Sequence, residues 1–141
     1  MTNLELLKSF YDRVWIGGAI EEAGDYFDTS AAASGLMPDL AIGPQEFYEF
    51  VAPMLEMLEV QSVTFEHAVE QGDWISVMAS FEAMVRATGQ TITGSGMLMA
   101  RIEGNKIAEA FNCIDFLGFF ERLGLVPPDA LALCLTGQRL Q

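Results

Sequence analysis

The feature that most constrains the fold of this chain is a change in the spacing of its apolar residues near residue 61. From there, Val63, Phe65 and Val69 alternate with polar residues. A period of two is typical of a β-strand, because successive side chains of a strand point to opposite faces of the sheet. Turn sequences divide the stretch into segments of strand length. The sequence therefore predicts four successive antiparallel strands, at residues 61–70, 74–86, 93–103 and 106–114.

The residues before this stretch have helical spacing instead. Thr2 and Glu5 form the sequence of a capping box, in which each side chain bonds a backbone N–H at the start of the helix. Pro53 falls inside the third helical segment, where its missing N–H is expected to bend or break the helix. Three helices are predicted, over residues 2–15, 19–27 and 43–58.

Helices followed by grouped strands indicate an α+β fold, with the N-terminal helices packed on one face of a curved, mostly antiparallel sheet. Such a sheet and its helices can enclose a cavity. A closing helix is predicted over residues 116–123, and a short strand is predicted near residues 31–36. At 141 residues, the chain is expected to form one domain, residues 1–141.

The balance of charges argues against several kinds of partner. The chain has 20 acidic and 7 basic residues, for a net charge of -13 at pH 7. Basic residues are needed to neutralise the phosphates of nucleic acids and to dock on anionic membranes, so neither partner is expected. The first ten residues lack a secretory pattern, and Cys113 and Cys134 form no Cys-x-x-Cys pair. A cytoplasmic protein with free thiols is therefore expected.

Asp115 stands in an unusual place, between the apolar strand at residues 106–114 and the apolar helix at residues 116–123. An Asp before a helix commonly caps it, because its side chain accepts a bond from an unpaired backbone N–H. Alternatively, a carboxyl group enclosed by apolar residues can exchange protons near neutral pH. The spacing alone favours the cap and leaves the catalytic role open.

Two further sets of residues are candidates for a binding pocket. His67, the only histidine, falls on an apolar strand face. It is either a hydrogen-bonded core residue, an edge residue half in water, or an acid, a base or a hydrogen-bond donor in a cavity. Met97 and Met99, with Met78 and Met84 on the preceding strand, are either core residues or the lining of an adaptable apolar pocket. No metal site is predicted, because one histidine without a cysteine cluster offers too few ligands.

The segment over residues 104–124, GNKIAEAFNCIDFLGFFERLG, resembles the ending of the SnoaL-like polyketide cyclases, which belong to the nuclear transport factor 2-like superfamily. The residues that carry the resemblance are Gly104, Lys106, Ile107, Glu109, Phe111, Asn112, Asp115, Leu117 and Gly118. The resemblance implies a cone-shaped barrel with an internal apolar pocket. It also implies that Asp115 is the general acid and base of an aldol-type ring closure that uses no metal or cofactor.

The resemblance leaves two classes of function open. One is an enzyme acting on a hydrophobic carbonyl compound, with Asp115 as its proton carrier. The residues expected to bind that substrate are Phe111, Asn112, His67, Met97 and Met99. The other is a module with the same fold that binds a small hydrophobic ligand without catalysis.

A third reading, an isomerase-like or hydrolase-like reaction, would need a second acid or a tyrosine near Asp115, and Glu109 and Tyr48 are the candidates. His67 matches no position of the family pattern, and Phe111 stands where related chains often have Trp. A homodimer is expected, because the resemblance implies it and because an apolar outer face of the sheet needs a cover.

Overall fold

The computed structural model of the chain describes residues 1–34 and 41–140. In chain order, its elements are α1 (Asn3–Phe10), the π-helix η1 (Tyr11–Ile16), the 3₁₀ helix η2 (Ile20–Asp25), β1 (Phe27–Ser34), β2 (Ala41–Ile42), α2 (Pro44–Met57), β3 (Leu58–Gln71), β4 (Trp74–Val85), β5 (Thr91–Glu103), β6 (Lys106–Ile114), α3 (Phe116–Leu123) and α4 (Ala130–Leu135). None of the helices in the described part of the chain is long and apolar enough to cross a membrane.

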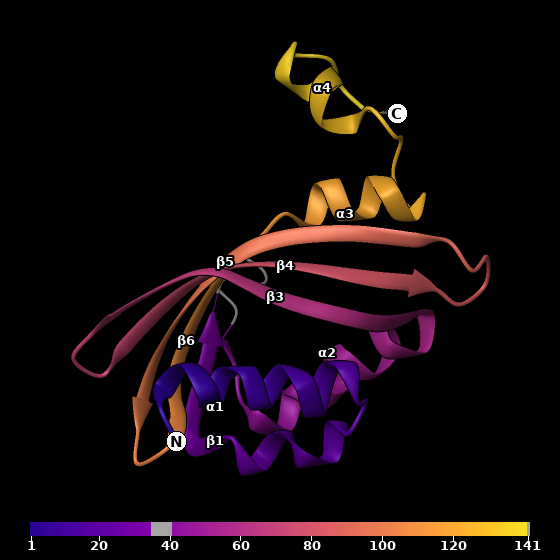
Figure 1. Ribbon diagram of the computed structural model, residues 1–141. Coiled ribbons are helices and arrows are strands. Elements are labelled where there is room, and N and C mark those ends of the chain that lie inside the picture. Colours follow the sequence, from indigo (N-terminus) through magenta and orange to yellow (C-terminus); the bar gives the residue numbers. More distant parts are fainter. Residues whose placement is uncertain (35–40, 141) are drawn as a thin grey trace.

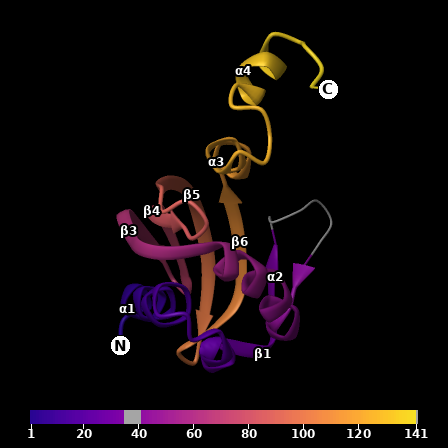
Figure 2. The same ribbon diagram turned by 90° about the vertical axis from the view of Figure 1, so that its right-hand side faces the viewer.

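The strands form one six-stranded sheet in the order β2-β1-β6-β5-β4-β3. The four long strands β3 to β6 pair as antiparallel neighbours, as the alternation predicts. Two strands extend this meander, because β1 pairs parallel to β6 and β2 pairs antiparallel to β1. Figures 1 and 2 show a strongly curved sheet with α1 and α2 on one side of it. The α+β fold is thus confirmed, but the described strands form an open sheet rather than a closed cone, with β2 and β3 at its two edges.

Most predicted elements lie where the sequence places them. The strand at residues 106–114 and the helix at residues 116–123 have the predicted bounds. The predicted strand at residues 31–36 corresponds to β1, although its last two residues lie outside the described part of the chain. Of the two outcomes predicted for Pro53, a bend or a break, the break is wrong: α2 runs through this residue from Pro44 to Met57. Val51, in the same helix, is buried.

The first predicted helix is found as two joined pieces, α1 and the π-helix η1. The capping box is present: the backbone N–H of Glu5 donates to Thr2 Oγ1 at 3.1 Å, and the backbone N–H of Thr2 donates to Glu5 Oε2 at 3.0 Å. Leu7 and Val14, one in each piece, are buried against the sheet residues Ile75 and Val77. The helix therefore covers one face of β4, which is called the inner face below.

A second, smaller core lies at the other end of the sheet, under α3. Phe119 of α3 packs there with Leu58, Ala83 and Ile92, which are all buried. Phe81 also joins this cluster, and its ring centroid lies 5.3 Å from that of Phe119. Helix α3 thereby fixes the direction in which the chain leaves the end of β6.

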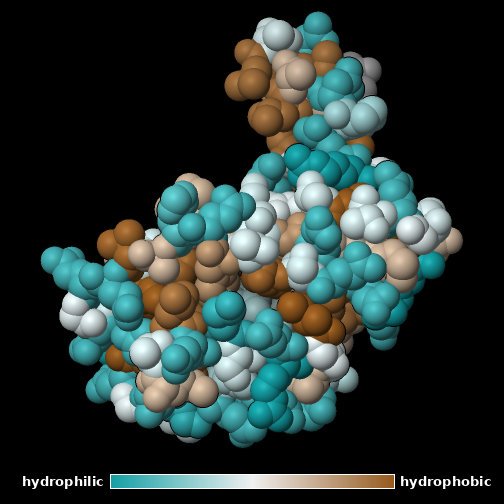
Figure 3. All heavy atoms as spheres, viewed as in Figure 1, coloured by the Kyte–Doolittle hydropathy of each residue, from teal (hydrophilic) through white to brown (hydrophobic). Residues whose placement is uncertain are grey.

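The chain after α3 leaves the sheet. Figures 1 and 2 show α4 standing beyond α3, away from the body of the molecule. The backbone N–H of Leu131 donates to Glu121 Oε1 at 3.1 Å, which ties α4 to α3. Leu125 and Leu135 are exposed, and hydrophobic atoms gather on one side of this projection (Figure 3).

We expect Gly94→Ala to destabilise the protein by about 1–3 kcal/mol, because overpacking a core forces neighbouring atoms to move. A Cβ atom at Gly94 of β5 would lie 2.2 Å from the ring of Phe81, which packs against Phe119 and cannot retreat freely. Urea unfolding measures this loss. Gly24→Ala is the matched control, because a Cβ atom there meets nothing within 4 Å. Equal stability of the two variants would contradict the packing argument.

Candidate functional site

The predicted site residues lie on β3, β5, β6 and the junction after β6, so the alternation of these strands decides which of them can meet. Asn112 of β6 is paired with buried Leu98 of β5 and shares the inner face with it. Phe111 is paired with Met99 on the opposite, outer face. A bulge at Ala108 interrupts the register between Ile107 and Glu109. The predicted substrate-binding residues are therefore divided between the two faces of the sheet.

Asp115 occupies the junction between β6 and α3. Its Oδ1 atom accepts a hydrogen bond from the backbone N–H of Gly118 at 3.0 Å, which is the geometry of a helix N-cap. Its own backbone N–H donates to the carbonyl oxygen of Ser95 on β5 at 3.0 Å. The side chain is exposed. The cap interpretation is thus confirmed, and Asp115 is not enclosed by apolar residues.

Gly118 explains part of the motif that follows Asp115. A Cβ atom at Gly118 would lie 2.3 Å from Asp115 Oδ2, so any larger residue would collide with the carboxylate. The glycine therefore lets the carboxylate lie across the first turn of α3. One oxygen of Asp115 is held by an N–H, and the other points to the space that a side chain at Gly118 would fill.

The inner face carries a small apolar pocket between β1, β6 and the start of α2. About 240 Å³ of space lies between its walls when the open solvent at its mouth is included, but the enclosed part has room for only about one water molecule. None of the residues lining it is titratable. They are Phe27, Ala31, Ala32, Ala33, Ile42, Gly43, Pro44, Phe47, Ile107 and Ala110.

Asn112 lies two residues beyond Ala110 on the same face of β6, and so next to this pocket. Its Nδ2 atom donates to the carbonyl oxygen of Ser34 at 3.3 Å, which ties the end of β1 to β6. The sequence predicts an internal pocket but not the residues that line it, because residues 28–43 have no clear periodicity. The signal was the run of three alanines at residues 31–33, since small side chains on a strand leave room beside it.

The other predicted binding residues lie on the outer face. His67, Met97, Met99 and Phe111 are all exposed there. His67 of β3 is opposite Met78 of β4, which is in turn opposite Met97 of β5. These side chains are close to one another across the strands, but the thickness of the sheet separates them from the inner pocket.

Comparison with known proteins identifies the family. The family model of the SnoaL-like polyketide cyclases matches residues 5–123. The chain belongs to the SnoaL-like polyketide cyclase family. No curated protein matches the chain by sequence. The family match confirms the resemblance carried by the segment from Gly104 to Gly118.

Solved structures with the fold of this SnoaL-like chain include AclR from Streptomyces galilaeus, a proposed hydroxylase, with a TM-score of 0.74 and 14% identity over 88% of this chain and 82% of that chain. A proposed polyketide cyclase from Acidithiobacillus ferrooxidans has a TM-score of 0.69 and 20% identity, over 86% of this chain and 93% of that one. A protein from Catenulispora acidiphila with a ketosteroid isomerase-like fold has a TM-score of 0.65 and 17% identity, over 79% and 85% of the two chains. Identities this low show a common fold and leave the chemistry open.

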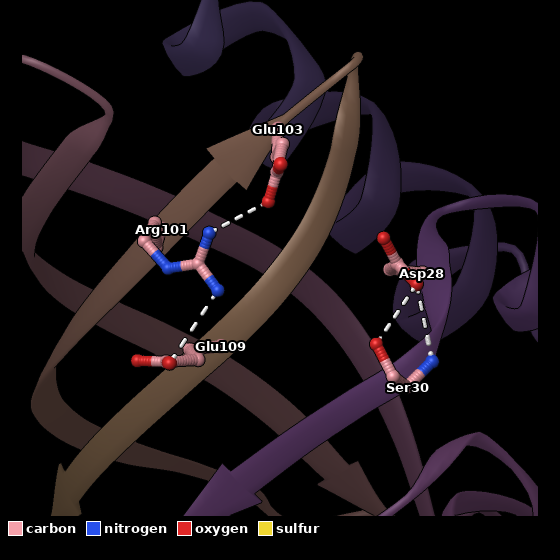
Figure 4. Close-up of polar contacts among 5 residues, drawn as sticks. All are labelled: Asp28, Ser30, Arg101, Glu103 and Glu109. Carbon is pink, nitrogen blue, oxygen red and sulfur yellow. Dashed lines mark hydrogen bonds and ion pairs between the residues drawn. The ribbon is translucent and has the colours of Figure 1, made fainter.

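Of the two residues predicted to assist Asp115, Glu109 bonds to another side chain and Tyr48 is exposed to solvent. Glu109 lies on the outer face, where its Oε1 atom accepts from Arg101 at 3.4 Å (Figure 4). Tyr48 of α2 is exposed. Tyr11 of η1 is a third phenol, and burial raises its pKa, so it stays neutral. Its ring packs against Phe65 on β3 with the two ring centroids 5.7 Å apart, so it belongs to the main core of the protein.

A small network of charged side chains surrounds Arg101 on the outer face of the sheet (Figure 4). Arg101 donates to Glu103 at 2.8 Å, and this bond raises the pKa of the guanidinium. Bonds from Ser30 lower the pKa of Asp28, and the charge of Arg101 adds a smaller effect. Among the described residues there is no group of three or more His, Cys, Asp or Glu side chains that could hold a metal ion.

We expect Asp115→Ala to lower the free energy of unfolding by about 1 kcal/mol, because the N–H of Gly118 loses its partner. Asp129→Ala is the matched control: Asp129 precedes α4 but makes no capping bond with its side chain. Its removal should change stability by less than about 0.5 kcal/mol. Chemical denaturation of the two variants measures both effects, and similar losses would count against the cap.

Proposed function

We propose that this chain is a cofactor-free acid–base enzyme acting on a hydrophobic carbonyl compound, with Asp115 as its proton carrier. The observation that carries this proposal is the orientation of the Asp115 carboxylate, which is fixed at the end of β6. Asp115 lies in the segment whose sequence resembles the family pattern. Oδ1 of Asp115 accepts a hydrogen bond from the backbone N–H of Gly118, which holds the carboxylate in one orientation. A general base has to be positioned against the proton that it takes, and the cap supplies this positioning.

The proposed chemistry follows from such a base. The Asp115 carboxylate takes a proton from a carbon next to a carbonyl group, and the electrons of that C–H bond form an enolate. The enolate carbon attacks a second carbonyl carbon of the same molecule, so that a C–C bond forms and the ring closes. The protonated Asp115 then returns its proton to the new alkoxide. Each step moves one proton or one electron pair, and no oxidant or reductant is needed.

The inner face would receive the hydrophobic part of the substrate. The pocket beside Ala110 offers apolar walls to a hydrocarbon or aromatic group, but it has to open before such a group can enter, because its enclosed part has room for only about one water molecule. Asn112, between Ala110 and Asp115 along β6, presents an amide that can donate to a carbonyl oxygen once it releases Ser34. The proposal therefore assigns substrate contact to Asn112 and proton transfer to Asp115.

Asp115→Asn separates catalysis from capping, because Asn caps a helix about as well as Asp but cannot carry the proton. We expect this variant to keep the stability of the wild type and to lose about 100-fold or more of its activity. The assay follows deuterium uptake next to the carbonyl of β-tetralone in deuterium oxide by NMR. Asp129→Asn, at an uninvolved helix start, should leave the rate unchanged. Exchange that persists in Asp115→Asn would remove the enzyme proposal.

A second candidate function, ligand binding without catalysis, is favoured by one observation. The residues lining the inner pocket include no titratable group, and Asp115 is exposed rather than enclosed. Such a pocket can hold an apolar ligand but supplies no acid or base of its own. Binding of an apolar ligand without any proton exchange would support this candidate over the first.

We expect Ala110→Leu to weaken the binding of Nile red, a neutral apolar dye, because the longer side chain fills the pocket. The dissociation constant should rise at least tenfold, which corresponds to about 1.4 kcal/mol. Ala87→Leu, at an exposed turn residue, is the matched control and should leave binding unchanged. Fluorescence titration measures both. Equal affinities in the two variants would place the dye outside this pocket.

A further inference from the structure

We propose that the outer face of the sheet carries a binding site for a soft metal ion, Cu(I), formed by His67, Met78 and Met97. These residues lie on three neighbouring strands, β3, β4 and β5. The site takes no part in the acid–base chemistry proposed above, because the sheet lies between it and the inner pocket. Either proposal can therefore fail without the other.

Strand register brings the three side chains into one row across the sheet. His67 is directly opposite Met78, and Met78 is directly opposite Met97. Directly opposed residues of neighbouring strands share a face of the sheet and have their Cβ atoms about 4.5–5.5 Å apart. Met78 stands in the middle of the row, between two long side chains. The row therefore offers one ring nitrogen and two thioether sulfurs to an ion above Met78.

A β-bulge directs His67 to this row. Phe65, two residues earlier on β3, is opposite Ala79 and packs inward against Tyr11. In a regular strand, residues two apart share a face, so His67 would also point inward. The register instead shifts between Phe65 and His67, which puts His67 opposite Met78 on the outer face. Bulges often re-aim a side chain in this way. The only histidine of the chain is thus turned toward two methionines.

The chemistry of these ligands selects a soft ion. Thioether sulfur is a soft ligand that favours Cu(I), and imidazole also binds copper, whereas calcium and magnesium prefer oxygen ligands. Zinc sites are built from His, Cys and carboxylate groups. No group of three or more such side chains that could hold an ion is found in residues 1–34 and 41–140. The sequence-based expectation of no metal site counted the same ligand types and left methionine out.

The ligands are accessible and held on a firm support. Met78 is 40% exposed, Met97 is 48% exposed, and His67 is also exposed. Their backbones are fixed by the pairing of β3, β4 and β5, while methionine side chains stay flexible. The sulfur atoms can therefore turn toward an ion without a change in the sheet. The net charge of -13 also favours the approach of a cation.

Titration of Cu(I) without oxygen, in competition with the chromophoric chelator bicinchoninate, tests the proposal. Thiolates bind soft ions by themselves, so the titrated protein carries Cys113→Ser and Cys134→Ser. Both cysteines are exposed, so these changes should leave the fold intact, which circular dichroism checks. We expect this thiol-free protein to bind one Cu(I) ion per chain. Absence of binding would overturn the proposal.

Variants of the thiol-free protein test the individual ligands. Met78→Leu and Met97→Leu keep the size of the side chain and remove the sulfur. Each should raise the dissociation constant for Cu(I) at least about 10-fold, since even residues that only support metal ligands change affinity by this factor. His67→Gln should do the same. Met84→Leu is the matched control and should leave it unchanged, because Met84 of β4 is opposite Glu59 and Thr91 rather than a soft ligand. Equal affinities of Met97→Leu and Met84→Leu would overturn the proposal.

NMR of the wild type, with its methionine methyl groups labelled with carbon-13, requires no folded variant of the thiols. Cu(I) should shift the methyl signals of Met78 and Met97 together and leave that of Met84 in place. Cys113 is opposite Met97 on the side away from Met78, so an ion bound only by this thiol would affect Met97 alone. A shift of Met97 without Met78, or of neither, would overturn the proposal.

Discussion

Burial of the inner face of β4 and β5 against the first helix is the interaction on which the rest of the structure depends. Leu7 and Val14 meet Ile75 and Val77 there, and all four are buried. Because the side chains of a strand alternate, fixing this one face also fixes the direction of every neighbouring side chain on β4 and β5. The same packing that forms the core therefore turns residues such as Met78 outward.

The junction after β6 starts a helix and also holds the carboxylate of the proposed reaction. Asp115 ends a strand, begins a helix and holds a carboxylate in one orientation through Gly118. These roles do not compete, because the bond that caps the helix uses one oxygen and leaves the other free. The packing of Phe119 against Phe81 keeps α3 on the sheet, so the position of Asp115 depends on the second core as much as on its own cap.

The two faces of the sheet differ in character. The inner face is covered by helices and leaves a small apolar pocket near Ala110 and Phe47. The outer face exposes Met97, Met99 and Phe111 to solvent in the single chain. In a chain with a net charge of -13, an apolar surface with few charges is the place where another molecule meets the least repulsion. The apolar pocket and the exposed apolar side chains thus lie on opposite faces of the sheet.

Sequence by itself determined the α+β order, the four long strands and the cap at Asp115, because periodicity and capping are local properties of neighbouring residues. Only the tertiary structure decided which side chains of each strand face the core. The bulge at Ala108 shifts the alternation of β6, and no local sequence pattern predicts this bulge. It also decided that β1 pairs with β6, a contact between segments about 80 residues apart, and this pairing creates the pocket. The sequence therefore marked Phe111, His67 and Met97 as candidate binding residues but could not show that they lie outside the pocket. Which side of a sheet is covered depends on where distant helices pack.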